Sequence, residues 1–95
     1  MDTPAVQEQL HRLKELLSVP TTDLVWQSRY STSEEAISDL ELLEKGVLNN
    51  DQASVDELLF LLAPTGSLQE ISISSGWGQE FLDIAAALEL ELGAR

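Results

Sequence analysis

The chain has 95 residues, and its 17 Asp and Glu against 5 Lys and Arg give a net charge of −12. Phosphate backbones and anionic lipid surfaces repel such a chain, which argues against binding to nucleic acid or to a membrane surface. The absence of cysteine excludes disulfides, thiolate nucleophiles and Cys-based metal sites.

The length fits one hydrophobic core, so we expect a single domain over residues 1–95. The first residues, Met1–Pro4, are followed by no apolar run, unlike a signal peptide. No stretch approaches the roughly 18 apolar residues of a membrane-spanning helix. Because the lack of cysteine also fits a reducing compartment, we predict a cytoplasmic protein.

The first helix is predicted to begin at Thr3, where a capping residue precedes Pro4 at the first helical position. Pro20 should end this helix by Val19, since the residue before a proline disfavours helical geometry. The apolar residues between them recur with helical spacing and form the expected buried stripe: Val6, Leu10, Leu13 and Leu17.

The following segment, 21–30, has two interpretations. Thr21-Thr22-Asp23 is suited to capping a short helix, whereas apolar residues at alternating positions suit a strand. Because no partner strand is evident, we favour a short helix or an irregular segment. Trp26 and Tyr30 are expected to cover one edge of the core.

Two overlapping capping boxes, Ser31 with Glu34 and Thr32 with Glu35, predict the start of the second helix. Gly46 or the Asn-Asn pair that follows it should end the helix. The expected buried side consists of Ala36, Ile37, Leu40, Leu43 and Val47.

The third helix is predicted to be central, because residues 55–63 are apolar nearly all the way round. Asp51 can cap it, and Ser54 with Glu57 offers a second capping box. Phe60 and Leu61 should point away from the inward face. That face is expected to consist of Val55, Leu58, Leu59 and Leu62.

Ser67 with Glu70 forms a further capping box, so we favour a short helix over 68–73, with a strand as the alternative. The last helix should open after Gly76 and bury the stripe Trp77, Phe81, Ile84 and Leu88. The fold class is therefore all-α, as a single compact bundle of four to five helices.

The sequence offers little to catalysis. His11, the single histidine, lies off the apolar stripe of its helix and has no catalytic partner at a motif spacing. One histidine without cysteine does not supply the several ligands of a zinc site. Carboxylate pairs such as Glu80 with Asp83 lie opposite apolar stripes, where charges favour solubility. We therefore predict a non-enzymatic protein without a cofactor or metal.

An acidic face of the second helix is the predicted partner-binding site. It lies opposite the buried side of that helix and contains one leucine among carboxylates. An apolar anchor within a charged rim is typical of protein interfaces. The alternative is a solvated face, with the leucine covered by another helix. The predicted site consists of Glu34, Glu35, Ser38, Asp39, Glu41 and Leu42.

In size, acidity and helicity the whole chain resembles the small immunity proteins of bacterial toxin systems. The stretches 63–70 and 76–78 add to this family-like character, without a named family motif. The resemblance implies an inhibitor that presents acidic surface to a partner with a basic surface, such as a nuclease toxin. It assigns no role to any individual residue.

The alternative function is a stand-alone adaptor, a regulatory module or a subunit of a homo-oligomer. Leu42, Leu61, Leu82 and Leu90 lie off the main apolar stripes. The surface that they leave must be covered either by neighbouring helices or by another chain. A toxin gene beside this gene would favour the inhibitor.

Overall fold

The computed structural model describes residues 3–19, 22, 24, 29–63 and 66–93. Within these ranges the regular structure is helical and no strand occurs, which confirms the all-α fold class. The described part of the chain forms the five helices α1 (Thr3–Leu17), α2 (Ser33–Leu48), α3 (Gln52–Leu62), α4 (Ser67–Ser75) and α5 (Gly78–Leu92).

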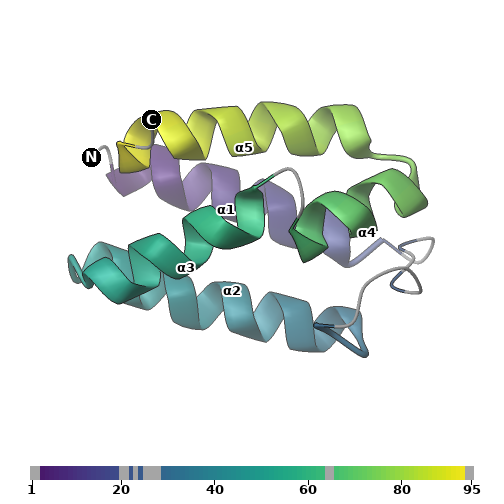
Figure 1. Ribbon diagram of the computed structural model, residues 1–95, viewed down its shortest axis with the longest axis horizontal. Helices are drawn as coiled ribbons and strands as arrows, with labels where there is room; N and C mark the ends of the chain where they lie inside the picture. The colour runs from purple at the N-terminus through teal and green to yellow at the C-terminus, as the bar shows by residue number, and fades with distance from the viewer. Residues whose placement is uncertain (1–2, 20–21, 23, 25–28, 64–65, 94–95) are drawn as a thin grey trace.

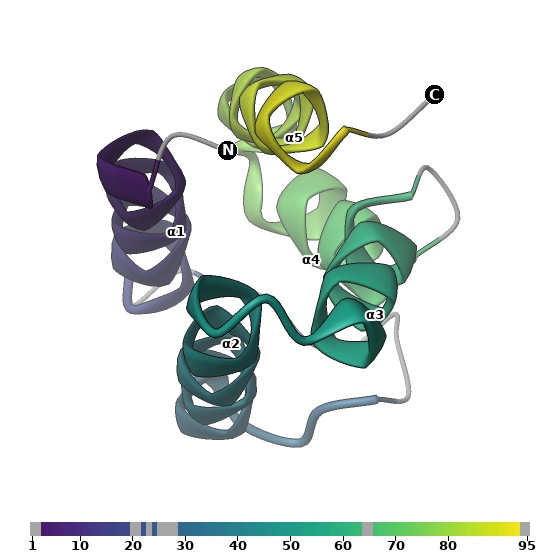
Figure 2. The same cartoon turned by 90° about the vertical axis from the view of Figure 1, so that its left-hand side faces the viewer.

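The helices are arranged in a ring around one core (Figures 1 and 2). Helix α1 packs against α2 and α5, and α3 packs against α2, α4 and α5. The Cα radius of gyration is 12.2 Å, close to the roughly 12 Å expected of a compact chain of this length. No described helix combines the length and the apolar character that crossing a bilayer requires.

Helices α1 and α5 bury the apolar stripes that their sequences predict. Val6, Leu10, Leu13 and Leu17 of α1 are all fully buried. Burial of a large apolar side chain contributes about 1.5–3 kcal/mol, so each stripe holds its helix firmly on the core. The corresponding buried residues of α5 and the residue before it are Trp77, Phe81, Ile84, Ala85 and Leu88.

The inward face of α3 differs from the prediction. Leu58, Leu61 and Leu62 are buried, whereas Leu59 is only half-buried. The expectation that Leu61 points away from the core was therefore wrong. Because α3 contacts three other helices, its buried side is set by their positions, and an almost wholly apolar stretch leaves that side undetermined. Phe60 does point outward, with 65% of its surface exposed.

The second helix begins with one of its two predicted capping boxes. The side-chain oxygen of Thr32 accepts from the Glu35 backbone N–H at 3.1 Å, and Glu35 Oε1 accepts from the Thr32 N–H at 3.2 Å. Glu35 Oε1 also accepts from the Ser31 N–H at 2.6 Å. The box of Ser31 with Glu34 is not formed, because Glu35 takes both backbone donors.

The capping boxes predicted for α3 and α4 were wrong. Ser54 lies inside α3, and its hydroxyl donates to the Asp51 carboxylate at 2.8 Å. Ser67 is the first residue of α4, so Gly66 occupies the capping position and supplies no side chain. The helix itself is confirmed and extends to Ser75, which rules out the strand alternative.

Most of the segment 21–30 lies outside the described residues, including Trp26. Its helix, strand and irregular interpretations therefore stay open. Tyr30, at the end of the segment, is 7% exposed and joins the core cluster. The prediction that this residue covers an edge of the core is confirmed.

Candidate functional site

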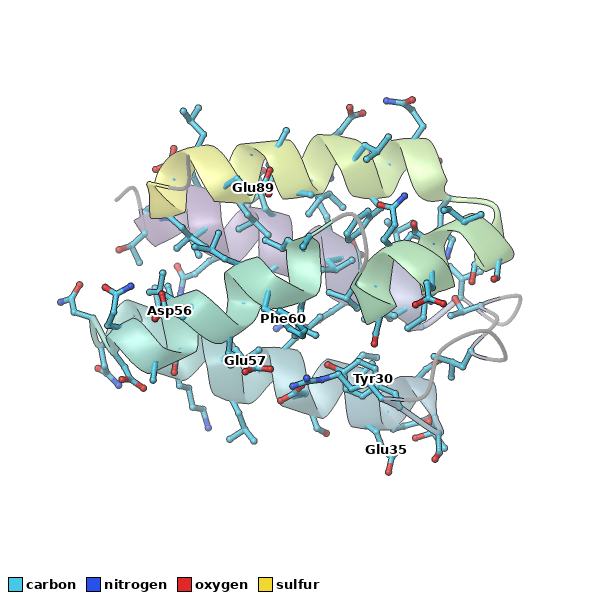
Figure 3. All side chains as sticks on the ribbon, in the orientation of Figure 1. Tyr30, Glu35, Asp56, Glu57, Phe60 and Glu89 are labelled. Atoms are coloured by element: carbon cyan, nitrogen blue, oxygen red, sulfur yellow. The ribbon has the colours of Figure 1, made fainter. Side chains whose placement is uncertain are left out.

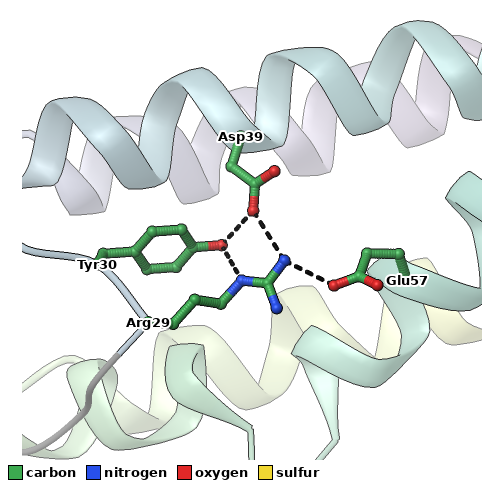
Figure 4. A network of polar contacts seen from close by, with 4 residues as sticks. All are labelled: Arg29, Tyr30, Asp39 and Glu57. Carbon is green, nitrogen blue, oxygen red and sulfur yellow. Dashed lines mark hydrogen bonds and ion pairs between the residues drawn. The ribbon is translucent and has the colours of Figure 1, made fainter.

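A polar network joins the segment before α2 to Asp39 of α2 and Glu57 of α3 (Figure 4). Asp39 Oδ2 accepts a hydrogen bond from the Tyr30 hydroxyl at 2.6 Å and from Arg29 Nη2 at 3.2 Å. Arg29 Nη2 also lies 2.6 Å from Glu57 Oε2, and Arg29 Nε donates to the Tyr30 oxygen at 3.1 Å. The segment before α2 is thereby fastened to both helices.

The network holds Tyr30 in its protonated form. Burial of the ring raises the pKa of the Tyr30 hydroxyl, and the hydrogen bond donated to Asp39 raises it further. Ionisation would place a phenolate beside the Asp39 carboxylate and remove that donated bond. The Arg29 guanidinium opposes the shift without reversing it.

This geometry changes the composition of the acidic face predicted on α2. Asp39 is turned to Arg29 and Tyr30, and only 27% of its side-chain surface is exposed. Glu35 is engaged in the capping box at the start of the helix. Four of the six predicted residues are exposed and belong neither to the Arg29–Tyr30–Asp39–Glu57 network nor to the capping box: Glu34, Ser38, Glu41 and Leu42.

Leu42 is exposed, at 66% of its surface, so none of the described helices covers it. Its nearest neighbours along the helix surface stand three and four positions away, at Ser38, Asp39, Lys45 and Gly46. They include a cation and a carboxylate that is already paired. The leucine is thus not ringed by free carboxylates, and its role as an anchor stays a prediction.

The cations of the described chain gather on the α1–α2 side. Lys14 of α1 pairs with Glu44 of α2 at 3.1 Å, with about a fifth of each side chain exposed. Arg29, in the segment before α2, pairs with Asp39 and Glu57. Arg12 and Lys45 belong to the same two helices. In this half, Glu44 and Asp39 are each paired with a cation.

Among the described residues, the other half of the bundle carries negative charge alone. No Lys, Arg or His occurs between Lys45 and Arg95. Glu57 is paired with Arg29 across the helices, whereas six further carboxylates of α3, α4, α5 and their connections form no ion pair within the described structure. Figure 3 shows Asp56 and Glu89 among them. The six are Asp51, Asp56, Glu70, Glu80, Asp83 and Glu89.

Sequence reasoning missed this surface because it treated charge as a total for the whole chain. The signal was present in the spacing of the basic residues along the sequence. A cation-free run of this length produces a single-sign surface wherever its helices fold together. That surface, on α3, α4 and α5, is named the acidic half below.

The described residues bring together little that could perform catalysis. His11 is exposed, and its Nε2 lies 3.6 Å from the carboxylate of Glu15 one turn away. No group of three His, Cys, Asp or Glu residues suited to a metal ion occurs in the described ranges. A surface hollow of about 200 Å³ beside the α2–α3 turn has a single carboxylate, Glu91, in its lining.

Comparison with known proteins finds no match to this chain among family models, curated proteins or solved structures. The features that point to a function are therefore the chemistry of the acidic half and the positions of the exposed apolar residues.

Proposed function

We propose that this protein is a small, non-enzymatic binding module whose acidic half docks a partner protein with a basic surface. The observation that carries the proposal is the cation-free acidic half, where six carboxylates form no ion pair with any described residue. Such a surface attracts basic proteins over long range and disfavours acidic ones.

The type of partner follows from the same charge. A protein that binds nucleic acid carries a basic groove, and an acidic module that occupies the groove excludes the phosphate backbone from it. We therefore propose an inhibitor or immunity-type role, as in bacterial toxin systems, acting in the cytoplasm. The small size and helicity of the chain fit this role.

The alternative, an adaptor or an oligomer subunit, draws support from exposed apolar residues. Phe60, Ile73 and Leu90 are each more than 60% exposed, and burying them would favour association. Two copies meeting through the acidic half would however oppose like charges. A basic partner removes that repulsion and still gains from burying exposed apolar surface, so it remains the preferred proposal.

Affinity capture tests the proposal. The purified chain is immobilised and exposed at low salt to a lysate of its source cells, and retained proteins are eluted with rising NaCl. We expect a basic protein that is released by salt and forms a defined complex with the chain in solution. The matched control bait carries Glu80→Gln, Asp83→Asn and Glu89→Gln, which keep side-chain shape and remove charge.

Two further results decide the outcome. If the partner has an activity that the native chain suppresses and the control bait suppresses less, the inhibitor role is supported. If the native chain and the control bait retain the same proteins to the same salt concentration, the acidic half is not a docking surface.

A further inference from the structure

Helix α5 carries a row of exposed apolar side chains. Leu82, Ala86 and Leu90 follow at intervals of four residues, so they lie on consecutive turns of one helix face. All three are exposed, Leu82 at 50% and Leu90 at 79%. Ile73 of α4 extends the row, because its Cγ1 lies 3.9 Å from where a Cβ would stand on Gly78, one turn before Leu82. Ile73, Leu82, Ala86 and Leu90 are named the α5 row.

No described helix covers this row. The opposite face of α5 buries Phe81, Ile84 and Leu88 in the core, against α1, α3 and α4. In the end-on view α5 lies at the top of the bundle, with α1 and α4 below it (Figure 2). Single exposed apolar residues are ordinary, but a continuous row along one helix face marks an interaction surface.

Carboxylates border the row on both sides. Asp83 and Glu89 stand three residues before and three residues after Ala86, so they flank it on the helix surface. Neither forms an ion pair with a described residue, and the whole of α5 contains no cation. The surface is therefore an apolar strip between negative edges.

The negative charge beside the α5 row indicates what kind of molecule would bind there. A second copy would place its own Asp83 and Glu89 against the same residues, and such like-charge contacts are unfavourable. A helix with leucine-type residues on one side and Lys or Arg beside them satisfies both the strip and its edges. Helix-in-groove recognition uses apolar anchors at this same helical spacing.

We infer that the α5 row is the docking surface for a cationic amphipathic helix of the partner protein. The apolar side of that helix covers Leu82, Ala86 and Leu90, and its basic residues pair with Asp83 and Glu89. The inference rests on the proposed function and specifies which part of the acidic half makes the contact.

Three labelled synthetic helices of the same length as α5 serve as probes. The first has leucine on one side and lysine beside it, the second replaces the leucines with serine, and the third replaces the lysines with glutamate. Binding to the native chain is measured by fluorescence anisotropy. We expect the leucine–lysine helix to bind about tenfold or more tightly than either other probe, since it alone matches both the apolar α5 row and the carboxylates beside it. Equal binding of the two lysine probes would overturn the α5 row while keeping attraction between acidic and basic surfaces. No preference for either lysine probe over the glutamate probe would overturn the proposed function as well.

Substitutions then locate the contact. Leu82→Ser with Leu90→Ser should weaken binding of the leucine–lysine helix by about tenfold or more, whereas Phe60→Ser, an equally exposed site on α3, should change it less than about twofold. Ala86→Lys keeps both leucines, and its added positive charge is expected to repel the probe. This variant tests the contact even if the double variant misfolds. Unchanged binding by Ala86→Lys, or loss on Leu42→Ser instead, would place the contact elsewhere and overturn the inference.

Discussion

At the scale of single residues, Tyr30 is the most informative position. It is the only tyrosine of the chain, it is nearly buried, and its hydroxyl donates to Asp39 at 2.6 Å. Burial and this bond both favour the neutral phenol over the phenolate. The alkaline absorbance change of tyrosinate therefore reports this one network without interference from other tyrosines.

We predict that Tyr30 titrates above the ordinary tyrosine pKa of about 10 in the folded protein. Tyrosinate absorbance followed across alkaline pH provides the measurement, and the denatured chain provides the reference. A folded-state midpoint equal to that of the denatured chain would show that the hydroxyl is solvated and that the network is not formed.

The same shift sets a stability trend. Because the folded pKa is raised, the contribution of Tyr30 is fully present below the unfolded pKa of about 10 and is lost as pH rises toward the folded pKa. Tyr30→Phe should cost about 1–2 kcal/mol at neutral pH, because Asp39 and Arg29 both lose a partner. It should also flatten the alkaline decline in the free energy of unfolding, measured by urea titration.

At the scale of helices, the packing of α3 predicts different costs for replacing two adjacent leucines with alanine. Leu58 is fully buried and Leu59 is half-buried. Leu58→Ala should destabilise by about 2–5 kcal/mol, as large-to-small core changes do, and Leu59→Ala by clearly less. Urea unfolding of the two variants decides the point. A larger loss of unfolding free energy for Leu59→Ala than for Leu58→Ala would instead support the inward face of α3 that the sequence predicted.

The turn from α2 to α3 brings Gly46 against Ser54. A Cβ on Gly46 would lie 1.9 Å from the Ser54 hydroxyl oxygen and 2.5 Å from its Cβ. In a helix interior alanine is normally more stabilising than glycine. Gly46→Ala should nevertheless destabilise the protein by about 1–3 kcal/mol, because the added Cβ overlaps Ser54. Gly78→Ala is the matched control, because its added Cβ meets nothing closer than 3.9 Å. Equal stability of both variants would mean that the helices do not approach closely here.

Local signals predicted the helices well and their orientation only in part. The Thr32–Glu35 box was readable because it needs only neighbouring residues. The Ser54 and Ser67 boxes failed because Asp51 and Gly66 already occupy the capping positions of α3 and α4. The buried side of α3 was not readable, because a stretch apolar on all sides is oriented only by the helices around it.

At the scale of the whole molecule, the charge divides between two halves of the bundle. The cations of the described chain belong to α1, α2 and the segment before α2, whereas α3, α4 and α5 contain none. The order of basic residues in the sequence was enough to predict this division. The inward turn of Asp39 was not predictable, because it depends on the path that brings Arg29 and Tyr30 to α2.

The most direct test of docking through the acidic half compares two variants of identical net charge. One carries Asp83→Lys with Glu89→Lys on α5, and the other carries Glu34→Lys with Glu41→Lys on the predicted face of α2. Neither pair of carboxylates belongs to the Tyr30 network, so both variants should fold. The affinity of each for the captured partner is measured as NaCl rises through the range where the Debye length falls to about 8 Å and below.

We predict that the native affinity falls as salt rises, that the α5 variant binds about tenfold or more weakly with little remaining salt dependence, and that the α2 variant keeps most of both. A native affinity that does not change with salt, together with equal binding by the two variants, would contradict docking through the acidic half.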